Sequence, residues 1–231
     1  MIEAHITNVA SITPDVVRLT LTAQALSHLE VTAPTQWLKL FIPPAAGSTE
    51  WVGRAYTVHH HKPADQQLQL DIVLHNNGPV AMWAATAQVG DVVGLGDLKG
   101  RFDYPGDAQW WLLVADESAQ PAAWTIIDGL PPGSCLTALF EVASGDRETP
   151  AELLSSATDL RWVHRGANAK GSALVSAVRD HEFPPGIGYA WVAGEASVVR
   201  DIHLLLAASG LHRRQLRTKG YWRIGHSDVS S

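Results

Sequence analysis

The segment Gly53–His61, GRAYTVHHH, carries side chains suited to two different kinds of chemistry. Three consecutive histidines could bind a metal ion, because imidazole is the commonest metal ligand in proteins. The Arg-x-Tyr-Thr sequence before them could instead hold a flavin nucleotide. An aromatic ring can stack on an isoalloxazine, a hydroxyl or N–H group can bind N5, and a guanidinium can hold a pyrophosphate by paired hydrogen bonds.

The geometry of a strand argues against the metal site. Successive side chains on a strand point to opposite faces, so His59 and His61 could share a face that His60 could not join. A zinc site needs three or four converging ligands, and no cysteine pair or second histidine cluster is placed to complete one. We therefore predict no metal ion, and we expect His60 and His61 at a solvated strand end.

A second stretch supports the flavin interpretation. Residues 71–91, DIVLHNNGPVAMWAATAQVGD, indicate a strand, a histidine, a turn and then a helix that begins at Gly78-Pro79. Free N–H groups and the helix dipole at such a start favour a bound anion. The alternatives are an ordinary strand-to-helix connection capped by His75, and a β-strand with a surface arginine and a half-buried tyrosine.

Hydrophobic patterns divide the chain into two halves. Alternation in Val16–Thr22 is typical of a half-buried strand. Further strands are expected at 36–44, 55–60, 67–74 and within 91–100, with a helix at 78–91. This content over residues 1–105 fits a small antiparallel β-barrel.

In residues 106–231 strands alternate with helices, which predicts a parallel α/β domain after a linker at Tyr104–Asp107. Strands are expected at 110–116, 135–142, 188–194 and 216–222, segment 160–165 follows the second of them, and helices are expected at 118–130, 171–181 and 195–210. A barrel followed by such a sheet is the order of flavin reductases of the ferredoxin-reductase type, an analogy at the level of fold.

Four stretches resemble the siderophore-interacting protein family, the FAD-dependent ferric-siderophore reductases. They are GRAYTVHH, DIVLHNNGPVAMWAATAQVGD, LLVADESAQPAAWTII and YAWVAGEASVVRDIHLLLAASGLHRRQLRTKGYWRIG. The last is the most specific, and matches run through nearly the whole chain. The resemblance implies an N-terminal FAD-binding barrel and a C-terminal NAD(P)H-binding domain.

The resemblance also implies which residues contact the flavin. The expected contacts are Arg54, Tyr56, Thr57, Val58 and His59 on the strand, with His75, Gly78, Pro79, Val80 and Ala81 on the pyrophosphate and adenosine side. His59 stands where the family commonly has a second arginine. Its side chain is shorter and its charge depends on pH, so we expect it to loosen FAD or alter its potential.

Two acidic segments match the family's Ala-Asp-Glu-Thr and Gly-Glu-Ala and imply contacts with the dinucleotide. The residues are Asp116, Glu117, Gly194, Glu195 and Ala196. Both segments follow strands, at the sheet edge where α/β proteins bind ligands. Asp, Ser and Glu also favour helix N-caps, and both roles can coexist. No Gly-x-Gly-x-x-Gly fingerprint is present, and the family does not rely on one.

The electron donor and the substrate site are less defined. Ser144–Glu148 follows the second strand of the α/β domain, where a ribose 2′ group usually lies. Arg147 favours the 2′-phosphate of NADPH and Asp146 disfavours it, so NADH and NADPH both stay open as electron donors, as does ferredoxin.

An anionic siderophore complex needs a basic site, for which the candidates are Lys39, Lys219, Arg223 and His226. Each could equally be a solvated charge.

Composition narrows the functional classes. The chain has 231 residues, 46% of them hydrophobic, which is enough for two compact domains. The net charge of −6 disfavours nucleic-acid binding. A single cysteine, Cys135, allows no intrachain disulfide and indicates a reducing compartment. The start lacks the order of a signal peptide and the apolar runs are too short to span a bilayer, so we expect a soluble cytoplasmic protein. The sequence says little about the oligomeric state, for which a monomer is the default expectation.

Together these features predict an NAD(P)H-dependent ferric-siderophore oxidoreductase with FAD. Hydride would pass from nicotinamide to flavin, and single electrons from flavin to chelated Fe(III), so that Fe(II) is released. No catalytic acid or base is required by this chemistry. The alternatives are another flavin reductase or ferredoxin-coupled carrier of the same layout, and a non-enzymatic siderophore-binding protein.

Overall fold

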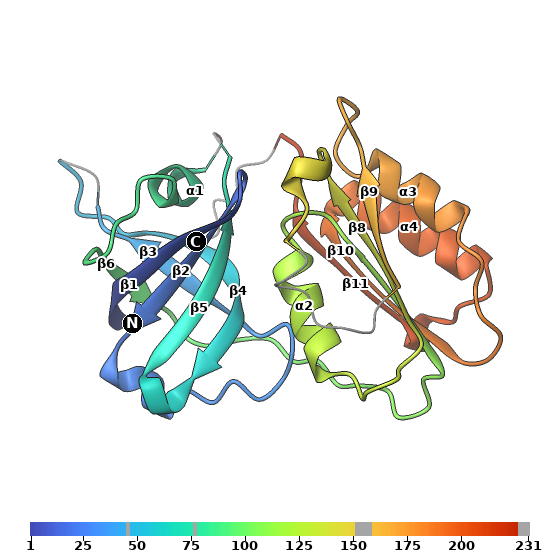
Figure 1. Ribbon diagram of the computed structural model, residues 1–231, viewed down its shortest axis with the longest axis horizontal. Helices are drawn as coiled ribbons and strands as arrows, with labels where there is room; N and C mark the ends of the chain where they lie inside the picture. Colours follow the sequence, from blue (N-terminus) through green and yellow to red (C-terminus); the bar gives the residue numbers. More distant parts are fainter. Residues whose placement is uncertain (45–46, 76–77, 151–158, 226–231) are drawn as a thin grey trace. The chain divides into compact units, whose positions relative to one another are not determined.

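The computed structural model describes residues 1–44, 47–75, 78–150 and 159–225. The chain divides into two compact units, Met1–Asp103 and Tyr104–Ser231 (Figure 1). The first is a closed antiparallel barrel and the second is a parallel sheet with helices, which confirms the predicted fold class. None of the helices in the described ranges has the length and apolar character that crossing a bilayer requires.

The strands of the barrel pair in the order β1-β2-β5-β4-β3-β6, and β6 returns to β1. Their bounds are β1 (Ile2–Thr13), β2 (Val16–Thr22), β3 (Trp37–Ile42), β4 (Val52–Lys62), β5 (Gln67–Val73) and β6 (Val92–Leu95). Short 3-10 turns lie at η1 (Gln24–His28) and η2 (Pro63–Asp65). The alternation predicted for β2 is confirmed, since Leu19 and Leu21 are fully buried.

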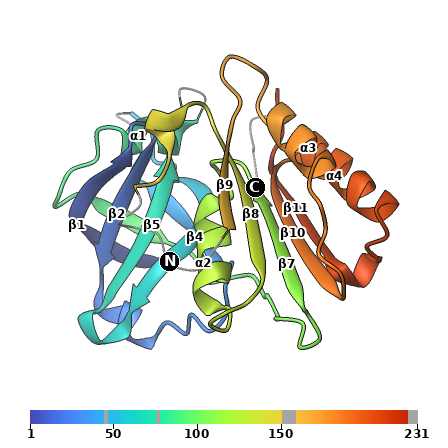
Figure 2. The same cartoon turned by 45° about the vertical axis from the view of Figure 1, so that its right-hand side comes forward.

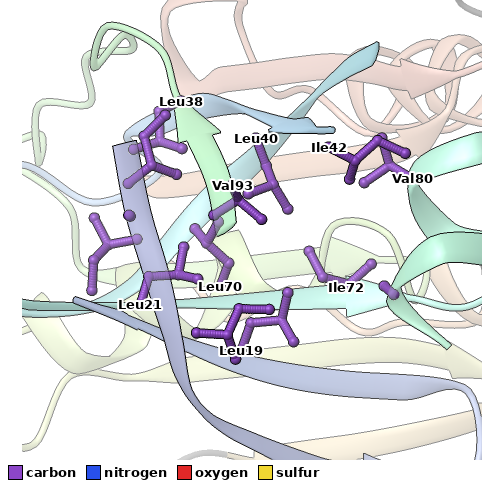
Figure 3. Packing of buried hydrophobic residues seen from close by; sticks show 14 of the residues in the cluster. Leu19, Leu21, Leu38, Leu40, Ile42, Leu70, Ile72, Val80 and Val93 are labelled. Atoms are coloured by element: carbon purple, nitrogen blue, oxygen red, sulfur yellow. The ribbon is translucent and has the colours of Figure 1, made fainter. Parts of the chain in front are cut away.

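Aliphatic side chains from alternate positions fill the barrel (Figure 3). Leu38, Leu40 and Ile42 supply the inward face of β3. Val80 of helix α1 (Pro79–Ala84) belongs to the same cluster. The helix packs on β3, β4 and β5, so the core places α1 beside the strand that carries Arg-x-Tyr-Thr.

Helix α1 is shorter than the predicted 78–91, because the end of that segment pairs with β1. The N–H of Gly90 donates to the carbonyl of Ile6 at 2.8 Å, and the N–H of Ile6 donates to the carbonyl of Asp91 at 2.9 Å. A backbone N–H or C=O group that bonds to a neighbouring strand is not available for a helical hydrogen bond. The helix therefore ends at Ala84, and the chain that follows joins the barrel. The helix prediction was therefore right in place and wrong in length.

Strand β1 was not predicted, and its irregular register explains why. The pairing with β2 shifts between Ile6 and Asn8 and again between Ser11 and Thr13. Each shift moves the following side chains to the other face, which interrupts the period of two that identifies a strand in a sequence.

The second unit is a sheet in the order β11-β10-β7-β8-β9, with every neighbouring pair parallel. The elements are β7 (Trp110–Ala115), α2 (Gln120–Gly129), β8 (Leu136–Val142), η3 (Gly145–Arg147), β9 (Asp159–His164), α3 (Ser172–Arg179), β10 (Gly188–Glu195), α4 (Ala196–Ala208), η5 (Arg213–Gln215) and β11 (Leu216–Trp222). Helices α3 and α4 cover one face of the sheet and α2 lies on the other (Figure 2). The predicted stripe Val199, Ile202 and Leu206 is buried in α4.

The strand order creates a topological switch between β7 and β10. From β7 the chain builds β8 and β9 on one side, and it then crosses to build β10 and β11 on the other. In open α/β sheets, ligands bind outside the carboxyl ends of the strands at such a switch. The segments after β7 and β10 therefore lie where a dinucleotide is expected.

Candidate functional site

Strand β4 places Arg54 and Tyr56 on the same face. Arg54 lies opposite Leu40 and Tyr56 lies opposite Leu38 on β3. Opposite residues of antiparallel strands project from the same face, and both leucines belong to the core. Arg54 and Tyr56 therefore share the core side of the sheet, whereas Thr57 projects from the other side. Burial raises the pKa of Tyr56 above its usual range, so its phenol is neutral.

Strand β4 has helix α1 as a neighbour as well as strand β5. Among the described residues, β5 pairs with β4 only from Val58 onward, while α1 packs on β4. The side chain of Val58 is in the core and its N–H donates to the carbonyl of Gln36 at 2.9 Å, so Val58 anchors the strand. Arg54 Nη1 donates to the carbonyl of Gly53 at 2.8 Å.

The start of α1 offers backbone donors beside a histidine. Pro79 is the first helical residue, and the N–H groups of Val80 and Ala81 have no acceptor inside the helix. A Cβ on Gly78 would lie 2.7 Å from Cε1 of His75, so glycine lets the ring pack against the backbone. A cationic side chain on β4 and N–H groups without an acceptor inside helix α1 fit the pyrophosphate of FAD.

His59 lies beside a carboxylate that an arginine already holds. Its Nδ1 is 3.7 Å from Asp71 Oδ2. Arg18 Nε donates to Asp71 Oδ1 at 2.6 Å and Nη2 donates to Oδ2 at 2.8 Å. The three residues come from the neighbouring strands β4, β5 and β2. Where the resemblance leads one to expect a second arginine, this chain thus has a histidine next to an ion pair.

The other two histidines of the segment have separate surroundings. His61 Nε2 is 2.9 Å from the carbonyl oxygen of Leu26, whereas His60 is exposed. Across the described part of the chain, no three or more His, Cys, Asp and Glu side chains are grouped to hold a metal ion.

The candidate substrate residues lie on different elements. Lys39 faces Ala55 on the outer side of the barrel, opposite to the face of Arg54. Lys219 Nζ lies 5.2 Å from the ring centroid of Tyr221, and burial lowers its pKa. Arg223 follows β11 and is exposed. His226 is outside the described residues.

Asp116 cross-links the carboxyl ends of three strands in the second unit. Its Oδ1 accepts hydrogen bonds from the N–H and hydroxyl of Ser118 at 2.9 and 2.5 Å. Its Oδ2 accepts from the N–H of Glu195 at 2.9 Å and from Nε1 of Trp222 at 2.8 Å. Burial raises the pKa of Asp116 against the opposing effect of these donors. Gly194 allows the approach, since a Cβ there would lie 2.5 Å from Oδ2.

Glu195 caps helix α4, as one of the two sequence interpretations expected. Its Oε2 accepts from the N–H groups of Ser197 at 2.7 Å and Val198 at 3.0 Å, and its Oε1 accepts from Ile224 at 3.3 Å. Burial works to raise its pKa, but these hydrogen bonds outweigh it and the pKa of Glu195 is lowered. The carboxylate is thus used inside the unit, and contacts of Gly194, Glu195 and Ala196 with a dinucleotide stay a prediction.

Arg165 joins two buried carboxylates at the same sheet edge. Its Nη1 pairs with Glu117 Oε1 and lies 3.6 Å from Glu141 Oε1. Glu141 Oε1 also accepts from the N–H of Gly171 at 2.6 Å. Its Oε2 has no hydrogen-bond partner within the described ranges. Arg165 and Glu141 were missed in the sequence, although a lone glutamate inside the apolar strand LTALFEV signals a buried charge that needs a partner.

We expect Glu141→Gln to change how stability depends on pH. Burial raises the pKa of Glu141 above 4.5, so its contribution to stability is complete below that value and is lost as the pH rises through the raised pKa. Glutamine keeps an oxygen for Gly171 and cannot ionise. Relative to the wild type, the variant should therefore gain free energy of unfolding as the pH rises from 4.5 through the raised pKa. Urea unfolding followed by tryptophan fluorescence measures this difference.

The exposed Glu3 provides the control, because Glu3→Gln removes a carboxylate from the surface of the chain and should leave the pH dependence of the wild type unchanged. A wild-type minus Glu141→Gln difference that stays constant with pH would contradict the expectation.

Family models match both units of the chain. Residues 5–102 match the model described as a siderophore-interacting FAD-binding domain, and residues 108–225 match the model described as a siderophore-interacting protein. A solved siderophore utilization protein from T. fusca superposes with a TM-score of 0.85 and 32% identity, covering 99% of this chain and 94% of that one.

Curated relatives include proteins of quite different length. The mycobactin import ATP-binding/permease protein IrtA of Mycolicibacterium smegmatis is 29% identical over 97% of this chain, which spans only 26% of that protein. The ferric vibriobactin reductase ViuB of Vibrio cholerae is 27% identical over 94% of this chain and 87% of its own length.

The resemblance inferred from four short stretches is therefore confirmed by matches along almost the whole chain. The first unit carries a FAD-binding domain of the same family. On these matches, the chain belongs to the siderophore-interacting protein family.

Proposed function

We propose that this protein is an FAD-dependent ferric-siderophore reductase that receives electrons from NADH or NADPH. The observation that carries the proposal is the common face of Arg54 and Tyr56 on β4 beside α1, inside a domain matched by a FAD-binding family model. ViuB is named a ferric vibriobactin reductase, and a relative in Escherichia coli is named an NADPH-dependent ferric-chelate reductase.

On this proposal the residues of the first unit bind and orient FAD. The guanidinium of Arg54 and the backbone N–H groups of Val80 and Ala81 hold the pyrophosphate, with His75 packed against Gly78. The ring of Tyr56 packs against the isoalloxazine, and Thr57 offers its hydroxyl or N–H to the ring edge. Bound flavin supplies hydride acceptance and single-electron transfer, for which the protein needs no acid or base of its own.

The second unit positions the nucleotide at the switch between β7 and β10. The carboxylates of Asp116, Glu117 and Glu195 have partners inside the unit. We propose that they hold the strand ends at fixed spacing, and that the backbone of Gly194–Ala196 lines the site. The side chains of the two acidic segments then stabilise the fold, while their backbone lies close to the cofactor.

The substrate is a ferric chelate, whose hard oxygen ligands bind Fe(II) far less well than Fe(III). We propose that Lys39, Lys219, Arg223 and His226 supply positive charge for an anionic complex. We also propose that the protein acts in the cytoplasm as a monomer. Ferredoxin is an alternative electron donor.

The test is the visible spectrum of the purified protein under anaerobic conditions. We expect a yellow protein that bleaches with NADH or NADPH and recovers on addition of a ferric siderophore. A protein that takes up no FAD would overturn the proposal, and a non-enzymatic siderophore-binding protein would then be the better description. A flavoprotein that bleaches but does not recover with ferric siderophore would indicate another flavin reductase.

A further inference from the structure

The turn after β8 carries a carboxylate and a guanidinium that are paired with each other. Asp146 Oδ2 lies 3.2 Å from Arg147 Nε. The hydroxyl of Ser144 hydrogen-bonds to the other oxygen of the same carboxylate. The side chain of Asp146 is 64% exposed and that of Arg147 is 29% exposed, so Asp146 is the more accessible of the two.

Neighbouring elements hold this turn in place. Its backbone closes one 3-10 turn over Gly145–Arg147. The carbonyl of Ala143 accepts from the N–H of Gly166 at 3.0 Å, and Glu148 Oε1 lies 2.6 Å from His164 Nε2. Both contacts tie the turn to the end of β9. The two charged side chains are therefore presented by a supported backbone.

The turn lies where dinucleotide-binding sheets contact the ribose 2′ group of the cofactor. β8 is the second strand of the α/β unit and pairs with β7, whose carboxyl end borders the switch. In dinucleotide-binding sheets of this kind, an acid near the end of the second strand binds the ribose hydroxyls of NADH, whereas an arginine there accommodates the 2′-phosphate of NADPH. This chain has both residue types in adjacent positions.

The charge state of Asp146 determines which of the two cofactors, NADH or NADPH, is favoured. The hydrogen bond from Ser144 is the main cause that lowers the pKa of Asp146, and Arg147 adds to it. The carboxylate is therefore ionised at neutral pH. A 2′-phosphate would have to approach this negative charge and compete with it for Arg147, which are two costs that NADH does not meet.

We infer that Asp146 selects NADH over NADPH by repelling the 2′-phosphate and by engaging Arg147. Asp146 is thus a specificity-determining residue, and the inference rests on the proposed function for the use of a nicotinamide donor. Arg147 contributes to NADPH binding only when Asp146 is neutralised.

Stopped-flow reduction of the FAD-loaded protein by each nucleotide tests the inference. The wild type should be reduced more efficiently by NADH, by about tenfold or more, and Asp146→Asn should remove most of that preference through tighter binding of NADPH. Asp159→Asn is the matched control. Asp159 forms a similar exposed pair with Arg161 at 2.6 Å. This pair lies at the amino end of β9, whereas Asp146 follows the carboxyl end of the neighbouring strand β8.

Calorimetry with adenosine 2′,5′-bisphosphate and 5′-AMP gives a second readout that does not depend on flavin. Asp146→Asn should gain about tenfold in affinity for the bisphosphate and little for 5′-AMP. Arg147→Ala should abolish that gain in the Asp146→Asn background and change little in the wild type, because Asp146 engages Arg147 there.

The outcomes separate this inference from the proposed function. A wild type that prefers NADPH, or an Asp146→Asn protein with unchanged preference, overturns the inference and leaves the reductase in place. If neither nucleotide reduces bound FAD, and neither adenosine ligand binds, both are overturned.

Discussion

Arg54→Ala is expected to be purified without FAD and to bind added FAD about a hundredfold more weakly than the wild type. The reason is that Arg54 is a cation on the face of β4 that it shares with Tyr56, and helix α1 packs on this strand. Without it, the pyrophosphate would lack the charge-assisted contact that we propose for Arg54, and neutral N–H groups carry no full charge to replace it. Titration followed by quenching of flavin fluorescence measures the change.

Two further variants distinguish this role from a general effect of charge. Arg54→Lys should bind FAD with intermediate affinity, since lysine keeps the charge but not the paired donors. Arg101→Ala removes the same charge from a side chain of the first unit that is 84% exposed and should leave the affinity unchanged. Wild-type affinity in Arg54→Ala would assign the pyrophosphate to other groups.

Arg165→Ala is expected to lower the free energy of unfolding of the second unit by about 3 to 5 kcal/mol. The substitution removes the cation that lies between Glu117 and Glu141, and it leaves both carboxylates buried. Urea unfolding followed by tryptophan fluorescence measures the loss. FAD content checks that the first unit remains folded.

The loss should also be larger near pH 8 than near pH 5. Arg165 opposes the rise in the pKa of Glu141 that burial causes, so without the arginine Glu141 is easier to protonate, and at acidic pH its protonation reduces the cost of the lost pairing. Arg161→Ala is the control, because its pair with Asp159 is exposed and should contribute at most about 1 kcal/mol. If Arg165→Ala behaves like this control at every pH, the buried pairing does not stabilise the unit.

Regular alternation and helical periodicity made much of the fold predictable. β2 and the buried stripe of α4 follow their patterns, since each depends on a single buried face that repeats along one element. β1 and the end of α1 departed from expectation for a common reason. Both depend on backbone pairing inside the barrel, which a local pattern does not record: the register of β1 shifts twice against β2, and Gly90 and Asp91, beyond the end of α1, bond to Ile6 of β1.

The residues of the candidate site were likewise predictable where they form local motifs and unpredictable where they depend on distant partners. The residue types of the flavin strand and of the two acidic segments are visible as local motifs. The partners of Asp116 are not, because its hydrogen bonds reach Glu195 and Trp222, which are 79 and 106 residues away. The pairing of Glu117 with Arg165 likewise joins residues 48 positions apart.

The sequence by itself determined the family, the order of a barrel and a parallel sheet, and the motif proposed to bind the flavin, because each depends on residues close together in the chain. Only the tertiary structure decided how the charges are used. It made Asp116 a link between strand ends and placed Arg165 beside Glu117 and Glu141. The protonation state and the partners of a charged side chain depend on the donors and charges that the folded backbone places within a few ångströms of it.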